Sequence, residues 1–277
     1  MRLALSNLAL PKSISDQDLT RLSELGLAGL EVAPTRIAPW GSLSSAELRA
    51  FRSRLAAVGL SIPSLQAIFY GCEGAALLGD SQAFWIMQQQ VFRVAEIASQ
   101  LGASVAVFGA PKQRLRGSRS EEEAFALGVE RLAVLASTAQ EAGGVVLGLE
   151  PVPEYYGGDF LPRWRDVLAM VDAVDHPGLG VHLDTGCVML GGDEIGDAAI
   201  ACSRRLAHFQ IAEPGLGGFS HPQADHTAAA AALVATRYDG WTSIEMLEQP
   251  EGIEAVRTAV RYAANHYGPS RQAPGLI

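Results

Sequence analysis

Four short apolar runs in the second half of the chain each end on a side chain able to bind a metal ion or transfer a proton. A polar group at the end of a buried strand costs several kcal/mol unless something pairs it. Three carboxylates and one amide on successive strands cannot readily pair with one another, whereas a divalent cation would pair all of them. The runs are Gly148-Leu149-Glu150-Pro151, His182-Leu183-Asp184-Thr185-Gly186, Phe209-Gln210-Ile211-Ala212-Glu213 and Ser243-Ile244-Glu245-Met246.

The side chains that end these runs form a donor set of oxygens. Glu150, Asp184, Gln210 and Glu245 are hard ligands, which suit Mn²⁺ or Mg²⁺ best, with Co²⁺ or Zn²⁺ as alternatives. Any one of these acids alone is more often a solvated carboxylate at the edge of a loop. Their recurrence at one strand level favours a single metal site instead.

Two histidines accompany these residues. Side chains two residues apart share a face of a strand, so His182 points inward with Asp184, and His208 with Gln210. We interpret both histidines as donors that lie below the ion and orient its ligands. Ordinary core histidines with satisfied hydrogen bonds are an equally good interpretation.

Strand-like and helical segments alternate along the whole chain and would position these residues. Capping signals such as Ser44 with Glu47, and stops such as Gly26 and Gly59, separate the segments. The pattern predicts strands over residues 3–10, 27–33, 60–67, 105–108, 145–150, 179–184, 206–212 and 241–245. It predicts helices over residues 15–25, 44–58, 81–101, 120–142, 164–174, 195–204, 225–236 and 253–266.

Eight strand–helix pairs without a linker predict an α/β fold, a single-domain (β/α)8 TIM barrel over residues 1–268, with 269–277 as a C-terminal tail. In such a barrel, reactive residues lie at the carboxyl ends of the strands. An open doubly wound sheet is the alternative. That fold would need a glycine-rich phosphate-binding turn after the first strand, and residues 6–11 supply none.

Composition narrows the function classes. The chain has 277 residues, 48% of them hydrophobic, and a net charge of −9, which disfavours binding to nucleic acid. No uncharged apolar run approaches the roughly 20 residues of a membrane span. No export signal is evident at the N-terminus, and three cysteines form no regular framework, so we expect a cytoplasmic protein with free thiols. The expected partner is a small molecule, with a homo-oligomer left open.

The runs described above resemble those of the xylose isomerase-like, or sugar phosphate isomerase/epimerase, barrels, a superfamily that includes apurinic endonuclease type IV. The resemblance covers nearly the whole chain and is most specific in 149–151, 183–186, 210–213 and 238–245. It implies one divalent ion held at Glu150, Asp184, Gln210 and Glu245, with Glu150 and Glu245 also acting as acid and base. Gln210 departs from the histidine that the family has at this ligand position.

The implied reaction is proton transfer at a carbon next to a carbonyl. An ion that holds the carbonyl and hydroxyl oxygens stabilises the enediolate, and Glu150 and Glu245 could remove and return the proton. The sequence therefore predicts an isomerase or epimerase of a sugar or sugar derivative. A metal-dependent lyase or dehydratase on a keto-sugar or hydroxy-keto acid is the alternative, and a non-catalytic ligand-binding barrel is a third. Six histidines are too few for the three-metal endonuclease site.

The loops suggest which residues contact the substrate. Ketose 3-epimerases of the family place a His three residues after the Asp and an Arg six after the His ligand. These positions hold Cys187 and Leu216 here, which weakens a ketohexose epimerase assignment. Lys112 begins a basic run that favours a solvated face, or else contact with a phosphate or carboxylate. The candidate substrate contacts are Gln66, Lys112, Tyr156, Cys187 and Glu213.

Overall fold

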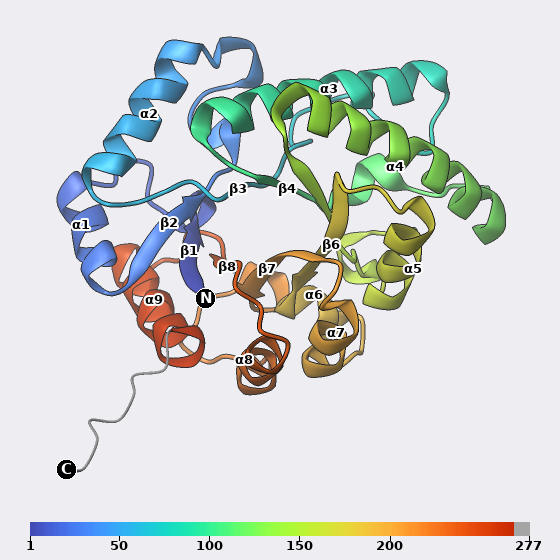
Figure 1. Cartoon of the computed structure of the whole chain (residues 1–277). Helices are drawn as coiled ribbons and strands as arrows, with labels where there is room; N and C mark the ends of the chain where they lie inside the picture. Colours follow the sequence, from blue (N-terminus) through green and yellow to red (C-terminus); the bar gives the residue numbers. More distant parts are fainter. Residues whose placement is uncertain (269–277) are drawn as a thin grey trace.

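Eight parallel strands curve into a ring, and helices surround it (Figure 1). The computed structural model describes residues 1–268. Adjacent strands follow the order β2-β1-β8-β7-β6-β5-β4-β3, and two isolated parallel bridges, Gly29 with Ser61 and Val32 with Leu65, close the ring between β2 and β3. The predicted TIM barrel is confirmed. The strands are β1 (Arg2–Ser6), β2 (Leu27–Glu31), β3 (Ser64–Leu65), β4 (Val105–Phe108), β5 (Val146–Leu149), β6 (Leu179–Asp184), β7 (Leu206–Ala212) and β8 (Trp241–Glu245).

The surrounding helices follow the strands in chain order. They are α1 (Asp16–Glu24), α2 (Ser45–Ala57), α3 (Ser81–Leu101), α4 (Glu121–Gly143), α5 (Trp164–Val174), α6 (Thr185–Leu190), α7 (Ile195–Cys202), α8 (His226–Ala235) and α9 (Ile253–Tyr267). Short 3-10 segments are η1 (Asn7–Ala9), η2 (Pro34–Arg36), η3 (Trp40–Ser42), η4 (Pro111–Arg114), η5 (Glu154–Tyr156) and η6 (Pro214–Leu216). Within residues 1–268, none of these helices is long and apolar enough to cross a membrane. The expected tail at 269–277 lies outside the described residues.

Local capping explains why the predicted helix boundaries agree well with the structure. Ser44 and Glu47 form the predicted capping box at the start of α2. The side chain of Asp80 accepts from the Ala83 N–H at the start of α3, and Gly102 ends that helix with a φ of 84°. Only glycine adopts such a left-handed backbone at little cost, so the stop is encoded in one residue.

Three elements differ most from the sequence-based prediction, beyond shifts of one or two residues at the ends of others such as β2 and α7. The first strand ends at Ser6, not at residue 10, because the Ser6 side chain accepts from the Leu8 N–H and starts η1. The third strand has two residues, where the apolar pattern over 60–67 predicted eight. Helix α6 was not predicted. It begins directly after β6, because Asp184 caps it by accepting from the Cys187 N–H.

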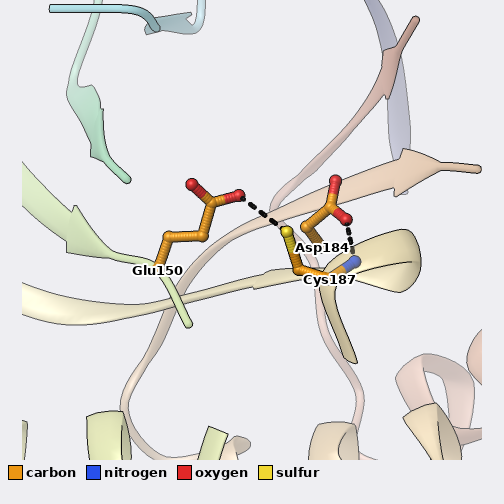
Figure 2. A group of neighbouring side chains, drawn as sticks. All are labelled: Glu150, Asp184 and Cys187. Carbon is orange, nitrogen blue, oxygen red and sulfur yellow. Dashed lines mark hydrogen bonds between the residues drawn. The ribbon is translucent and has the colours of Figure 1, made fainter. Parts of the chain in front are cut away.

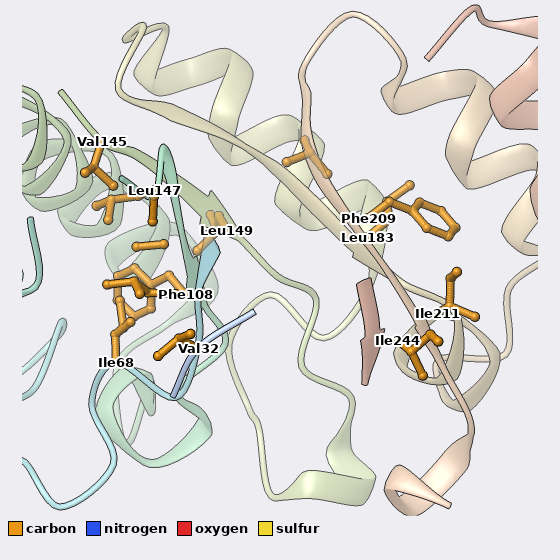
Figure 3. Packing of buried hydrophobic residues seen from close by; sticks show 14 of the residues in the cluster. Val32, Ile68, Phe108, Val145, Leu147, Leu149, Leu183, Phe209, Ile211 and Ile244 are labelled. Carbon is orange, nitrogen blue, oxygen red and sulfur yellow. The ribbon is translucent and has the colours of Figure 1, made fainter. Parts of the chain in front are cut away.

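Successive side chains on each strand alternate between an apolar layer on one face and the polar interior of the barrel on the other. Leu147 and Leu149 of β5, and Phe209 and Ile211 of β7, are fully buried in the hydrophobic core (Figure 3). Because neighbouring side chains on a strand point to opposite faces, the residues between them point into the barrel. The polar side chains at the carboxyl ends of β5 to β8 are delivered to the barrel mouth in this way.

Candidate active site at the barrel mouth

Glu150 directly follows β5 and projects over the end of the neighbouring strand. A Cβ at Gly109, just after β4, would collide with Glu150 Oε2, so only glycine leaves room for this carboxylate. The backbone oxygen of Glu150 accepts a 2.6 Å hydrogen bond from Arg114. Arg114 therefore anchors the backbone of Glu150, and Gly109 leaves space for its side chain.

Asp184 and Cys187 lie beside Glu150 (Figure 2). Asp184 Oδ1 accepts from the Cys187 N–H at 2.6 Å, and Cys187 Sγ donates to Glu150 Oε1 at 3.8 Å. The potential ligand atoms of the three residues all lie within 4.8 Å of one another. Asp184 Oδ2 is buried and has no hydrogen-bond partner. This group could hold a metal ion.

Glu245 ends β8 and faces the same space. It lines a cavity of about 450 Å³ together with Glu150, Gln66 and Lys112. Glu245 lies outside the Glu150–Asp184–Cys187 group. Its register partner on β7 is Ala212, two residues beyond Gln210, so Glu245 and Gln210 do not face each other directly across the sheet.

The carboxylates at the mouth repel one another. Burial and the charge of Asp184 raise the pKa of Glu150 to about 8, against the opposing effect of Arg114. Burial raises the pKa of Asp184 to about 6, although N–H groups of α6 oppose the shift. Burial and the charges of Asp184 and Glu150 raise the pKa of Glu245 well above its ordinary value. Because these oxygens lack sufficient cationic or donor partners in the protein, the donor set fits a divalent cation.

A second polar cluster occupies the barrel interior around Glu31, a residue that the sequence analysis did not single out. Glu31 is fully buried at the end of β2 and accepts from Ser64 Oγ at 2.7 Å. His208 Nε2 lies 2.7 Å from Oε2 of the same carboxylate. Gln210 Nε2 donates to the other oxygen of Glu31, Oε1, at 2.5 Å. Burial alone would raise the pKa of Glu31, but His208 and these hydrogen bonds lower it to about 2.

Gln210 connects this interior cluster to the mouth. Its amide nitrogen donates to Glu31, and its oxygen lies 2.8 Å from His182 Nε2. His182 Nε2 also lies 3.7 Å from Glu150 Oε1. Burial and the neighbouring His208 lower the pKa of His182 to about 3, so this imidazole is neutral. The amide oxygen predicted to bind a metal ion therefore already has one hydrogen-bond partner.

Gln66 links the interior to Glu245. With its nitrogen facing the carboxylates, its amide donates to Glu31 Oε1 at 2.6 Å and to Glu245 Oε1 at 3.0 Å, and it accepts from Ser6 Oγ at 2.7 Å. An amide oxygen in that position would face the two carboxylates, so this orientation satisfies Glu31 and Glu245, while it places the Gln66 nitrogen 2.9 Å from the amide nitrogen of Gln210. Gln66 thus donates a hydrogen bond to Glu245, whereas His182 Nε2 lies 3.7 Å from Glu150 Oε1, beyond hydrogen-bond distance.

Arg114 is buried behind Glu150, although its basic loop favoured a solvated face. It is 1% exposed, and its Nε and Nη1 atoms have no partner. Burial lowers the pKa of Arg114 to about 10, while the charge of Glu150 opposes this shift. Lys112, two residues earlier, is exposed at the cavity wall. This loop thus carries one buried cation, Arg114, and one solvent-exposed cation, Lys112, at the wall of the cavity.

Two of the predicted substrate contacts, Glu213 and Tyr156, make hydrogen bonds that join loops. The carboxylate of Glu213 is buried, where Oε1 lies 2.7 Å from His226 Nε2 and Oε2 accepts from the Gln223 N–H at 2.6 Å. The hydroxyl of Tyr156 accepts from the Gly215 N–H at 3.0 Å and so joins η5 to η6. Gln66, Lys112 and Cys187 remain at the mouth. Glu31 was missed, and Arg114 was considered only as part of the basic run, because their partners come from distant segments, although Glu31 also ends an apolar run.

Comparison with known proteins identifies related folds. A family model described as xylose isomerase-like TIM barrel matches residues 19–266, whereas no curated protein matches the chain. D-psicose 3-epimerase from Clostridium cellulolyticum H10, solved with D-tagatose, is 15% identical, with a TM-score of 0.80 and coverage of 97% of this chain and 100% of that one.

Two further solved structures have the same fold. The probable 3-DHS dehydratase AsbF from Bacillus anthracis is 14% identical, with a TM-score of 0.73 and coverage of 96% of this chain and 98% of that one. The IOLI protein, solved with a bound zinc atom, is 16% identical, with a TM-score of 0.73 and coverage of 96% and 98%. Identities this low establish a shared fold only.

Proposed function

The chain belongs to the xylose isomerase-like TIM barrel family, and we propose that it is a divalent-metal-dependent isomerase or epimerase of a sugar or sugar derivative. One observation carries the proposal: Glu150 and Glu245, from strands three apart in the barrel, line a single cavity of about 450 Å³. Pockets for small molecules span roughly 300–1,000 Å³. The sugar epimerase with the same fold supports this substrate class.

Glu150 and Glu245 are proposed to remove and return a proton on a substrate carbon next to a carbonyl. Glu150, Asp184, Gln210 and Glu245 would hold the ion, with Mn²⁺ or Mg²⁺ expected from their oxygen donors. When bound, the ion would polarise the carbonyl and hydroxyl oxygens of the substrate and make the neighbouring C–H more acidic. The zinc atom in one structure of this fold supports a metal site.

The surrounding residues hold the two acids in place. Arg114 anchors the backbone of Glu150, and Gln66 donates to the carboxylate of Glu245. His182 and, through Glu31, His208 would restrain the ligands from below. Carboxylates that are held in position need little rearrangement before a proton is transferred. Lys112 would contact an anionic group of the substrate at the rim.

A lyase or dehydratase is the second candidate. The dehydratase with the same fold supports it, and so does the position of Cys187, where sugar 3-epimerases of the family have a histidine. Such an enzyme would use the same proton abstraction but expel a leaving group from the adjacent carbon. The two candidates differ in their product, while their first step is shared.

Solvent-deuterium exchange tests this shared step. The protein is incubated in D2O with a panel of keto sugars and sugar acids after loading with Mn²⁺, Mg²⁺, Co²⁺ or Zn²⁺, and carbon-bound deuterium is measured by mass spectrometry. We expect exchange next to the carbonyl of one substrate, and none with Glu150→Gln. The exposed Glu122→Gln variant on α4 is the matched control and keeps the activity. Absence of exchange with every metal and substrate would refute the proposal, while loss of water would identify the lyase.

A further inference from the structure

Cys187 is the residue at the mouth whose chemistry differs most from an oxygen-only metal site. It lies in the first turn of α6 and is 7% exposed. The bond from its N–H to Asp184 fixes the turn, and its thiol faces Glu150 (Figure 2). Cys72 and Cys202, the other two cysteines, take no part in this group. The thiol is therefore held in place by the same carboxylates that are proposed to bind the ion.

The potential ligand atoms of Glu150, Asp184 and Cys187 are spaced so that they could bind one metal ion together. With a Zn–S distance of about 2.3 Å and a Zn–O distance of about 2.0 Å, tetrahedral ligands place sulfur and oxygen about 3.5 Å apart. Cys187 Sγ and Glu150 Oε1 are 3.8 Å apart. All three potential ligand atoms of Glu150, Asp184 and Cys187 lie within 4.8 Å of one another. Only a small side-chain movement would bring them around one ion.

An independent observation points to a missing ligand at this place. Asp184 is 2% exposed, and its Oδ2 has no hydrogen-bond partner although Oδ1 has one. A buried carboxylate oxygen without a donor is costly, and a cation would remove that cost. Gln210, by contrast, already uses its amide oxygen toward His182 and its nitrogen toward Glu31. Cys187 is therefore better placed than Gln210 to complete the Glu150–Asp184 pair.

We propose that Cys187 is a ligand of the metal ion, and that the centre consequently binds Zn²⁺ or Co²⁺ in preference to Mn²⁺ or Mg²⁺. This inference rests on the metal centre of the proposed function and changes its expected ion. A thiolate is a soft ligand that selects zinc-like ions, whereas purely oxygen sites suit Mn²⁺ and Mg²⁺. A coordinating thiol is deprotonated, so two carboxylates and a thiolate would neutralise the ion and leave one excess negative charge.

Cobalt spectroscopy tests the inference directly. Metal-free protein is titrated with Co²⁺ while bound metal is measured by equilibrium dialysis and the near-ultraviolet absorption is recorded. A sulfur-to-Co²⁺ charge-transfer band is expected in the unmodified protein and in the matched controls Cys72→Ser and Cys202→Ser. The band is expected to be absent from Cys187→Ser, in which the Zn²⁺ affinity falls on the order of 100-fold while the Mn²⁺ affinity changes less than about threefold.

The outcomes separate this inference from the proposed function. Stoichiometric Co²⁺ binding without the band, or a band that persists in Cys187→Ser, overturns Cys187 as a ligand but leaves the metal-dependent enzyme intact. Failure to bind any of the four ions overturns both. Circular dichroism of Cys187→Ser shows whether the variant folds. If it does not, Cys187→Ala and the charge-transfer band of the unmodified protein decide the question.

Discussion

Two buried glutamates in one barrel have opposite electrostatic surroundings. Glu31, in the interior, accepts hydrogen bonds from Ser64 and Gln210 and contacts His208, and its pKa is lowered to about 2. Glu150, at the mouth, has a long contact with a thiol and acidic neighbours, and its pKa is raised to about 8. Burial raises the pKa in both cases. The difference comes from the partners that each carboxylate has.

The comparison distinguishes a carboxylate that contributes to the fold from one that can bind a proton or a cation. A buried charge with all its partners inside the protein contributes to the fold and has little left to offer a ligand. A buried carboxylate without them gains from an external partner, either a proton or a cation. Raised pKa values, which Glu150 and Glu245 have and Glu31 lacks, are therefore consistent with the proposal that the two residues at the mouth bind a ligand.

The largest expected effect is on catalytic activity and concerns the two glutamates at the mouth, Glu150 and Glu245. Glu150→Gln or Glu245→Gln should lower turnover by roughly 10³-fold, because general acid–base groups contribute about 10²–10⁴-fold. The metal-free variants should be at least as stable as the unmodified protein at neutral pH, because folding no longer has to bury or protonate these carboxylates. Deuterium exchange and urea denaturation measure the two effects. Retained exchange in either variant would remove that glutamate from the proposed pair.

The next effect is on stability and concerns the interior. Glu31→Gln should lower the free energy of unfolding by about 3 kcal/mol, because the buried groups of Ser64, His208 and Gln210 that contact the carboxylate would lose a charged partner, at roughly 1–3 kcal/mol per unsatisfied group. Urea denaturation measures this loss. The double variant Glu31→Gln/His208→Gln should recover part of it. If Glu31→Gln proves as stable as Glu150→Gln, the proposed contrast between interior and mouth is wrong.

The pH dependence of the metal-free protein sharpens the comparison further. Folding raises the pKa of Glu150 from 4.5 to about 8, so the folded state holds the carboxyl proton more tightly than the unfolded state. The stability that this proton contributes is present below pH 4.5 and is lost as the pH rises from 4.5 to about 8. Folding lowers the pKa of Glu31 from 4.5 to about 2, so its contribution is lost as pH falls through that range.

Unfolding free energies measured from acidic to mildly alkaline pH should therefore decline on both sides of about 4.5. Glu150→Gln should flatten the decline at higher pH, and Glu31→Gln the decline in acid. Added Zn²⁺ or Mn²⁺ should reverse the slope at higher pH, because the ion binds the deprotonated carboxylates. A metal-free protein that gains stability between pH 5 and 8 would contradict this account.

The smallest effect concerns Gln210, which joins the two regions. Gln210→His should tighten metal binding by about tenfold, because Glu31 would then orient an imidazole as carboxylates orient histidine ligands in metal sites. Titration calorimetry with Mn²⁺ and Zn²⁺ measures the change. A loss of affinity, or none gained, would assign Gln210 to the interior cluster alone.

The residues show where sequence reasoning is strong and where it is weak. The bounds of α3, β6 and β8 were predicted correctly, because caps, glycine stops and apolar runs are local signals. Helix α6 was missed because Asp184 was interpreted only as a ligand, although it also caps the helix. The fit of Glu150 against Gly109 depends on the pairing of β4 with β5, which no local pattern specifies.

The interior residues were harder to predict for the same reason. Glu31 and His208 are 177 positions apart in the chain, so their contact follows from the closed barrel alone. Arg114 resembled its exposed neighbour Lys112 in sequence, and only the path of η4 buries it. Long-range packing, which one sequence does not reveal, decides such placements.

The junction of β2 and β3 is closed by both backbone and side-chain contacts. Two isolated bridges with their backbone hydrogen bonds join these segments, and β3 has two residues. The 2.7 Å bond between Ser64 of β3 and Glu31 of β2 spans this junction inside the barrel. The loop after β3, which forms one wall of the cavity from Gln66 to Gly71, is tethered through the same contact. Loss of this carboxylate would therefore remove a contact at the shortest strand of the ring, directly before the loop that lines the cavity.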